Sequence, residues 1–151
     1  MGNRLINWYF LSRYDRNQQN PPKFKEVVLT SPEIDRATFK NYFFKVAGNA
    51  AKTRIYISYE DLPLRLPKFV QGGARVGSAI TEEENKWDMP GNIRSAQTIN
   101  FSTIDSGRLG HSIQYKVISS MHKSDKPGDG LIAEEDKTYK GNYLLIRRTS
   151  K

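Results

Sequence analysis

His111 is the side chain of this protein best suited to proton transfer near neutral pH. It lies in the stretch Gly107–Tyr115, after a strand-like run and before a helix-like one, and the chain has only two histidines. An imidazole takes up and returns a proton near physiological pH, so a histidine on a loop between a strand and a helix can act as a general base. The alternative is a structural histidine that caps the helix or hydrogen-bonds a carbonyl. The acid and the nucleophile that the chain can bring to His111 decide between these roles.

The composition leaves few other kinds of chemistry open. Without cysteine there is no disulfide, no thiolate nucleophile and no Cys-ligated zinc. The two histidines have neither HxxxH nor HExxH spacing, so we expect no metal site and no cofactor. The net charge is +8, but the basic residues are scattered among acids, and the densest group, Arg147, Arg148 and Lys151, comes with no nucleic-acid-binding signature. We therefore expect a solvated basic surface and no specific nucleic acid partner.

The length of the chain fits one domain with one core. We take this domain to span 1–151, with 124–151 as its least distinctive part. No apolar run reaches the roughly 18–20 residues needed to cross a bilayer. The first residues lack the apolar stretch and the small-residue cleavage site of a signal peptide. These features predict a cytoplasmic protein, and they leave an anchor upstream of Met1 open.

Apolar periodicity predicts three strands and the helices that connect them. Val27–Leu29 is a continuous apolar run that suits a strand buried on both faces, and Ile113, Val117 and Met121 recur at helical spacing. We expect strands over 24–30, 53–59 and 98–103. Helices should precede, separate and follow them: over 1–14, from Ser31 to Gly48-Asn49, a short one over 62–69, and one that begins in the His111 stretch. The last apolar run, over 143–146, is either a strand or buried coil. This alternation predicts the α/β class, a parallel sheet with crossover helices. Because three strands are few, one sheet edge should be left unpaired and apolar.

Four stretches, in the family's order, resemble the C-terminal half of an alpha/beta hydrolase, most closely a bacterial branch of that superfamily of unknown function. Met1–Arg4 resembles the end of the nucleophile elbow, His-Ser-Met-Gly-Asn-Arg, and Lys25–Asp35 resembles a strand that ends in Ala-Pro-Asp-Ile-Asp. Ile55–Leu64 with Gly73–Gly77 resembles the Ser-x-x-Asp-x-Ala-Leu strand end and the Arg-x-Gly turn. Leu109–Ser112 resembles the Gly-His-Ser histidine loop. The likeness covers about residues 1–115 and implies a partial alpha/beta-hydrolase fold.

The resemblance implies a catalytic triad in the chain order serine, acid, histidine. Asp61, directly after the second predicted strand, matches the catalytic acid, and its carboxylate would hold the His111 imidazole in the right tautomer and stabilise the imidazolium. Asp35, after the first strand, is the competing acid, and its other role is an acid in a first helical turn that favours the helix dipole. Asp105 is nearer to His111 in sequence, but we interpret it as a turn acid.

The nucleophilic serine would lie immediately before Met1. Ser112 follows His111 into the helix, Ser58 lies within a predicted strand, and neither has the Gly-x-Ser-x-Gly surroundings of an elbow. Met1 follows the nucleophile, so its backbone N–H would be an oxyanion-hole donor, which a chain terminus replaces with an ammonium group. The chain as written should therefore lack hydrolase activity.

Two hypotheses of different class follow. In the first, the chain is a fragment, truncated at the elbow's own Met codon, of a serine hydrolase that acts on ester or related acyl bonds. In the second, it is a non-catalytic, hydrolase-derived remnant or binding module. A half-sheet expressed alone should aggregate or self-associate through its open edge.

Overall fold

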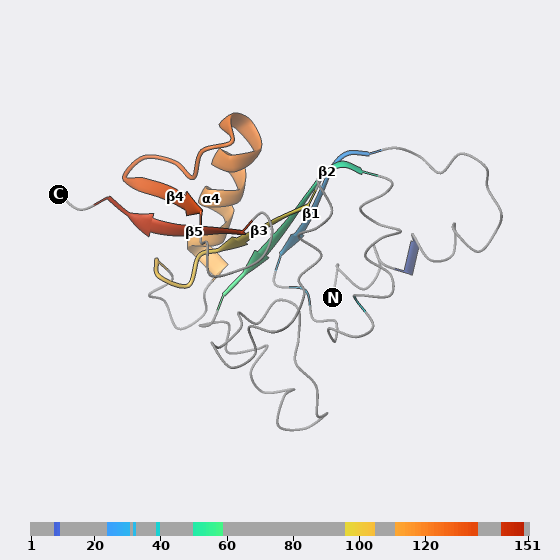
Figure 1. The fold of residues 1–151 in the computed structure, drawn as a ribbon, viewed down its shortest axis with the longest axis horizontal. Coiled ribbons are helices and arrows are strands. Elements are labelled where there is room, and N and C mark those ends of the chain that lie inside the picture. The colour runs from blue at the N-terminus through green and yellow to red at the C-terminus, as the bar shows by residue number, and fades with distance from the viewer. Residues whose placement is uncertain are drawn as a thin grey trace, which may run out of the picture.

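The computed structural model describes residues 8–9, 24–30, 32, 39, 50–58, 96–104, 111–135 and 143–149, with the backbone alone at 111–114 and 143 (Figure 1). Five strands and one helix lie within these ranges: β1 (Phe24–Thr30), β2 (Ala50–Ile57), β3 (Ala96–Asn100), α4 (His111–Ser124), β4 (Leu131–Glu135) and β5 (Tyr143–Arg148). The strands form one sheet in the order β1-β2-β3-β5-β4. β1, β2, β3 and β5 run parallel, and β4 is antiparallel to β5. The predicted α/β class, a mostly parallel sheet with a helix against it, is confirmed.

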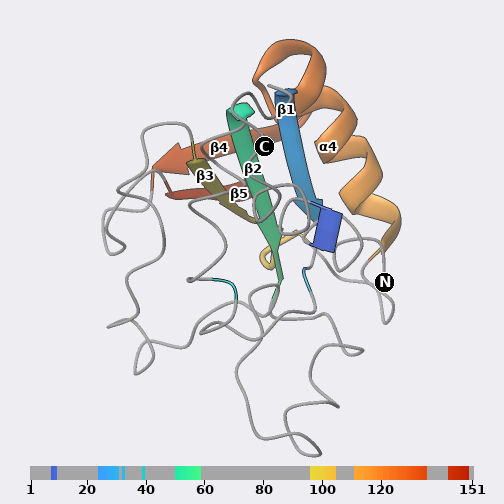
Figure 2. The same cartoon turned by 90° about the vertical axis from the view of Figure 1, so that its right-hand side faces the viewer.

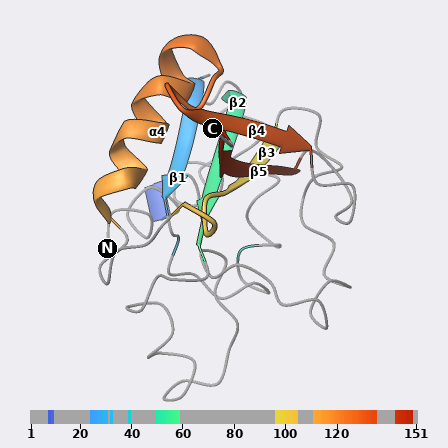
Figure 3. The same ribbon diagram turned by 90° about the vertical axis from the view of Figure 1, so that its left-hand side faces the viewer.

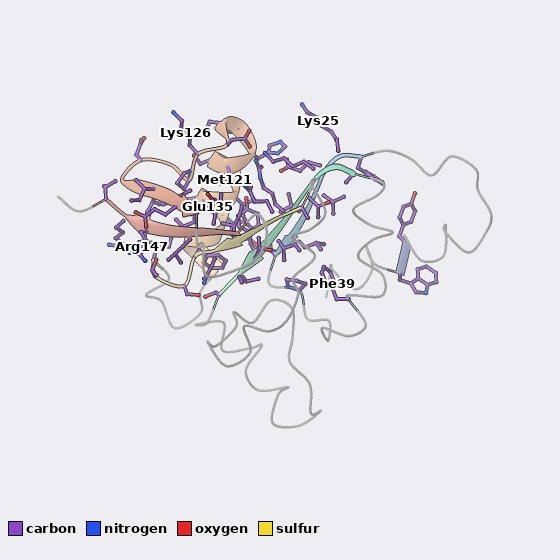
Figure 4. The ribbon with its side chains drawn as sticks, viewed as in Figure 1. Lys25, Phe39, Met121, Lys126, Glu135 and Arg147 are labelled. Atoms are coloured by element: carbon purple, nitrogen blue, oxygen red, sulfur yellow. The ribbon has the colours of Figure 1, made fainter. Side chains whose placement is uncertain are left out.

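The central strand β2 is buried on both faces, whereas β1, at the edge of the described sheet, is buried only at Val27 and Leu29. On one face Tyr56 and Ile99 form a core cluster with Val117 and Met121 of α4. Neighbouring residues of a strand point to opposite faces, so the fully buried Ile55 and Ile57 line the other face. Phe39 is also buried, and Figure 4 places it on the side of β1 and β2 away from α4. Because both faces of β2 are covered, nearly all of its residues are either apolar or polar with a hydrogen-bonding partner.

Helix α4 begins at the predicted position and uses the predicted face. Val117 and Met121, four residues apart, are both 1% exposed, and Ile118 packs beside them. The helix ends where Asp125 adopts a left-handed conformation with φ of 57°, and the Asp125 N–H donates to the Met121 carbonyl at 3.0 Å. This is a usual way for a helix to stop. Figures 2 and 3 show α4 lying along β1 on one face of the sheet.

The sheet has more strands than the sequence predicts. The predicted strands over 24–30, 53–59 and 98–103 correspond to β1, β2 and β3, and the apolar run over 143–146 is a strand, β5. The expectation of three strands is wrong because β5 and β4 extend the sheet beyond β3. β4 could not be predicted as a strand, because its sequence, LIAEE, is short and its apolar and polar residues do not alternate. The described sheet therefore ends in β1 and β4, and at β4 the edge is only partly apolar, because Glu134 and Glu135 follow three apolar residues.

The predicted helices fall largely outside the described residues. Trp8 and Tyr9 of the first are helical, and Phe39 of the second is helical and buried. The short helix over 62–69 lies wholly outside. Among the described helices none is long and apolar enough to cross a bilayer.

Candidate functional site

The carboxyl ends of β1, β2 and β3 meet at one edge of the sheet. The strands are parallel neighbours in register, with Thr30 paired to Tyr56 and Ile57 paired to Asn100. In open α/β sheets ligands bind at this carboxyl edge, where the loops that follow the strands come together. Any residue that directly follows one of these strands is therefore a candidate for the site.

Helix α4 brings His111 toward the same edge. Near its other end, the His122 Nδ1 atom lies 2.5 Å from Glu26 Oε2, close to where β1 begins. The eleven residues from His122 back to His111 span about 16 Å at the rise of an α-helix. Four residues of strand, from Glu26 to Thr30, span about 13 Å. Because α4 lies along β1, its first residue is level with the carboxyl end of that strand (Figure 2).

The exit from β3 is tightly held. Asn100 is 3% exposed, and its Oδ1 accepts hydrogen bonds from the backbone N–H of Ser102 at 3.0 Å and from the Ser102 hydroxyl at 2.6 Å. These two hydrogen bonds form an Asx turn. Within this turn the Phe101 N–H donates to the Ile57 carbonyl at 3.2 Å, which ties the turn to β2. The Thr103 hydroxyl donates to the Ile146 carbonyl. The chain thus leaves β3 in a direction set by β2 and β5 before it reaches α4.

The predicted acids come next in the chain after two of these strand ends. Asp35 follows β1 and Asp61 follows β2. Both lie outside the described residues, as does Met1, and for His111 the backbone alone is described. The choice between Asp61 and Asp35 as the partner of His111 therefore stays a prediction.

The two serines considered as substitutes for the nucleophile occupy other positions. Ser112 is the second residue of α4. Ser58 lies one residue beyond the end of β2 instead of within the strand, and it is 1% exposed. A serine buried to this extent is not available to attack a substrate. The strand predicted over 53–59 ends in the structure at Ile57, directly before Ser58.

A second polar cluster, at the amino ends of the strands, was not predicted. Arg54 of β2 is 2% exposed, and its Nη1 donates to Glu26 Oε1 at 2.6 Å, while its Nη2 donates to Asp125 just after α4. Lys52 also donates to Asp125. The hydrogen bond from Lys52, then the charges of Lys52 and Arg54, lower the pKa of the Asp125 carboxyl. These contacts join residues far apart in the sequence, so periodicity carried no signal of them.

This second cluster has a structural explanation. Its ion pairs tie the end of α4 to β1 and β2, at the edge opposite the carboxyl ends of the parallel strands. His122, expected to face solvent near a helix end, is 63% exposed in its side chain and contacts only Glu26 among the partners found in the described ranges. Nowhere in those ranges do three metal-ligating side chains gather.

Tyr56 lies between the polar cluster and the core. Burial, outweighing the opposing charge of Arg54, raises the pKa of the Tyr56 hydroxyl to about 12. This hydroxyl is buried without a hydrogen-bond partner in the described structure. A phenol that ionises so far above neutral pH and contacts no acceptor is a core residue and not an acid-base catalyst.

Comparison with known proteins adds one match. A family model described as alpha/beta hydrolase of unknown function (DUF900) matches residues 1–122. No curated protein and no solved structure matches the chain. The matched stretch ends inside α4, so the β4–β5 hairpin lies beyond it.

Proposed function

The chain belongs to a family of alpha/beta hydrolases of unknown function, and we propose that it carries the acid and the histidine of a serine hydrolase that cleaves ester or related acyl bonds. The nucleophile would be a serine directly before Met1 in the protein, at the end of the motif that Met1–Arg4 resembles. The natural substrate is a small ester or other acyl compound.

One observation carries this proposal. Three parallel, adjacent strands end at one edge, and the chain that leaves two of them carries Asp35 and Asp61, while α4 begins at His111 on the level of that edge. An acid and a histidine on neighbouring loops at the carboxyl edge are what the serine, acid, histidine order of this fold requires. At the opposite edge the described acid and histidine that meet, Glu26 and His122, belong to the cluster of paired ions and do not follow the carboxyl ends of strands.

The proposed chemistry proceeds in two steps. His111 accepts the serine proton as the serine oxygen attacks the carbonyl carbon, and then returns that proton to the leaving alcohol. In the second step His111 activates a water, which releases the acid and restores the serine. Asp61 holds the imidazole in the right tautomer and stabilises its charged form. The backbone N–H of Met1, as part of a peptide bond, stabilises the oxyanion.

The test uses the protein with the residues that precede Met1. A fluorophosphonate probe should label it once, at the residue before Met1, and a panel of p-nitrophenyl esters should include a substrate. His111→Ala should lower kcat by at least about 10⁴-fold, because the serine loses its base. The matched control is His122→Ala at the far end of the same helix, which should leave turnover unchanged. Equal activity of the His111→Ala variant and the unaltered protein would refute the mechanism.

The acid is tested in the same assay. Asp61→Asn should lower kcat by about 10⁴-fold, whereas Asp35→Asn should change it little. The reverse pattern would make Asp35 the acid and keep the hydrolase. A protein that is neither labelled nor active on any ester would instead be a non-catalytic binding module derived from the fold.

A further inference from the structure

The outer edge of β4 is exposed and unpaired by any strand in the described ranges. β4 is the last strand of the sheet on the side away from β1, as Figure 1 shows. Four of its five residues are exposed, including Ile132 at 37%. An open edge presents a row of backbone donors and acceptors that can pair with another strand.

The hydrogen-bond pattern determines which groups face outward. The Thr149 N–H donates to the Gly130 carbonyl at 3.0 Å, so this pair is a hydrogen-bonded one of the antiparallel ladder. Bonded pairs alternate along such a ladder, and Ile132 opposite Arg147 is the next. The intervening residues of β4, Leu131, Ala133 and Glu135, direct their N–H and C=O groups away from β5. Of these groups, the Leu131 N–H already donates to the Gly128 carbonyl of its own chain at 3.2 Å.

We propose that β4 pairs with β4 of a second copy of this chain, antiparallel and about a two-fold axis at Ala133. In this register Ala133 lies opposite Ala133 of the other copy, and Leu131 lies opposite Glu135. The Ala133 N–H of each copy then donates to the Ala133 carbonyl of the other, and the Glu135 N–H donates to the Leu131 carbonyl, which gives about four hydrogen bonds across the axis. An axis at Leu131 would instead place Glu135 opposite Pro127, which has no N–H to donate. The two sheets become one continuous sheet with an isologous interface.

The charges along the edge fit this register. Within one chain Ile132 lies opposite Arg147, and across the interface it lies opposite Glu134 of the other copy. Arg147 already reaches Glu134 of its own chain, with Nε 3.4 Å from Oε2, while both side chains stay half exposed. From that position it can extend over Ile132 to the acid of the other copy. On the opposite face, Leu131 lies between Arg148 and the incoming Glu135 in the same way.

Acids on an edge strand usually prevent pairing. Here no acid meets an acid, because each Glu of one copy faces an apolar residue of the other with an arginine behind it. The edge is therefore selective, since it accepts the same strand in one register and repels strands that place acids opposite Glu134 or Glu135. This self-association does not depend on the proposed hydrolase activity.

A single cysteine tests the register, because the chain has none of its own. In Ala133→Cys the two thiols face each other with Cα atoms about 5.5 Å apart, within the range of a disulfide. Mild oxidation should convert most of this variant to a covalent dimer. The matched control is Glu135→Cys, exposed on the same face of the same strand, whose two copies lie about 13 Å apart along the strand. Glu135→Cys should stay uncrosslinked.

A second measurement tests the association itself. Sedimentation velocity of the unaltered protein should show a dimer whose dissociation constant rises at least tenfold in Ala133→Pro, which removes an outward N–H and leaves the β4–β5 bonds intact. Ala133→Thr, which keeps the N–H, should still dimerise. A monomer at every concentration, a dimer unaffected by Ala133→Pro, or equal crosslinking of both cysteine variants would overturn the proposal.

Discussion

Replacing Arg54 with methionine should lower the free energy of unfolding by about 3 kcal/mol, because it leaves the Glu26 carboxylate buried without its main partner. The Arg54 and Glu26 side chains are 2% and 12% exposed, and their charged atoms lie 2.6 Å apart. Methionine keeps most of the packing of the arginine stem, so the loss reports the charge. Breaking a buried pair costs about 3–5 kcal/mol, and we take the low end because His122 still contacts Glu26.

The hydrogen bond from Arg54 to Asp125 adds little to the predicted loss of unfolding free energy. Asp125 is 70% exposed in its side chain and keeps its bond to Lys52 when the guanidinium is removed. A carboxylate so open to water gains little from one more ion pair. The predicted loss therefore comes from the Glu26 side of the cluster.

Urea unfolding followed by far-UV circular dichroism measures the effect. With an m value of about 2 kcal/mol/M, the midpoint of Arg54→Met should fall by about 1.5 M. Arg147→Met is the matched control, because that arginine is 55% exposed and its pair with Glu134 is 3.4 Å long. It should cost no more than about 0.5 kcal/mol.

A double-mutant cycle tests the reasoning behind the magnitude. If Arg54→Met is destabilising because it leaves the buried Glu26 carboxylate unpaired, then adding Glu26→Gln should restore a large part of the lost free energy of unfolding. A loss below about 1 kcal/mol for Arg54→Met would refute the argument. So would a double variant whose loss equals the sum of the two single losses.

Two further predictions concern titrating groups. The pKa of Asp125 is lowered in the folded protein, chiefly by its hydrogen bond from Lys52, so its contribution to stability is present above its ordinary pKa of 3.8 and is lost as the pH falls through the lower folded value. The urea midpoints of the unaltered protein and Asp125→Asn should therefore differ at pH 6 and converge below pH 3.8. A difference that stays constant with pH would contradict this prediction. Tyr56→Phe removes a buried hydroxyl that has no partner in the described structure, so it should leave stability at pH 7 unchanged or raise it by up to about 1 kcal/mol. Because the folded pKa of Tyr56 is about 12 against 10.0 in the unfolded chain, stability should be intact below pH 10 and decline as the pH rises toward 12 in the unaltered protein. Tyr56→Phe should decline less, and parallel alkaline unfolding curves would show that Tyr56 is not the group responsible.

Features that depend on local pattern could be predicted from the amino-acid sequence. The apolar run Val27–Leu29 identified β1, and the spacing of Val117 and Met121 identified α4 and its buried face, because strand and helix geometry impose fixed periods on buried positions. The α/β class followed from the alternation of such segments. The motifs around Asp61 and His111 pointed to the alpha/beta-hydrolase family whose model matches residues 1–122.

Features that depend on contacts between distant parts of the chain could be seen only once the chain was folded. β4 is a strand because β5 pairs with it, whereas its own sequence has no strand period. The sheet order, which joins β3 to β5, and the burial of Arg54 between Glu26 and Asp125 likewise depend on long-range contacts. From sequence alone a charged residue is predicted to be exposed to solvent. Only the folded chain supplies the opposite charges that offset the cost of burying it.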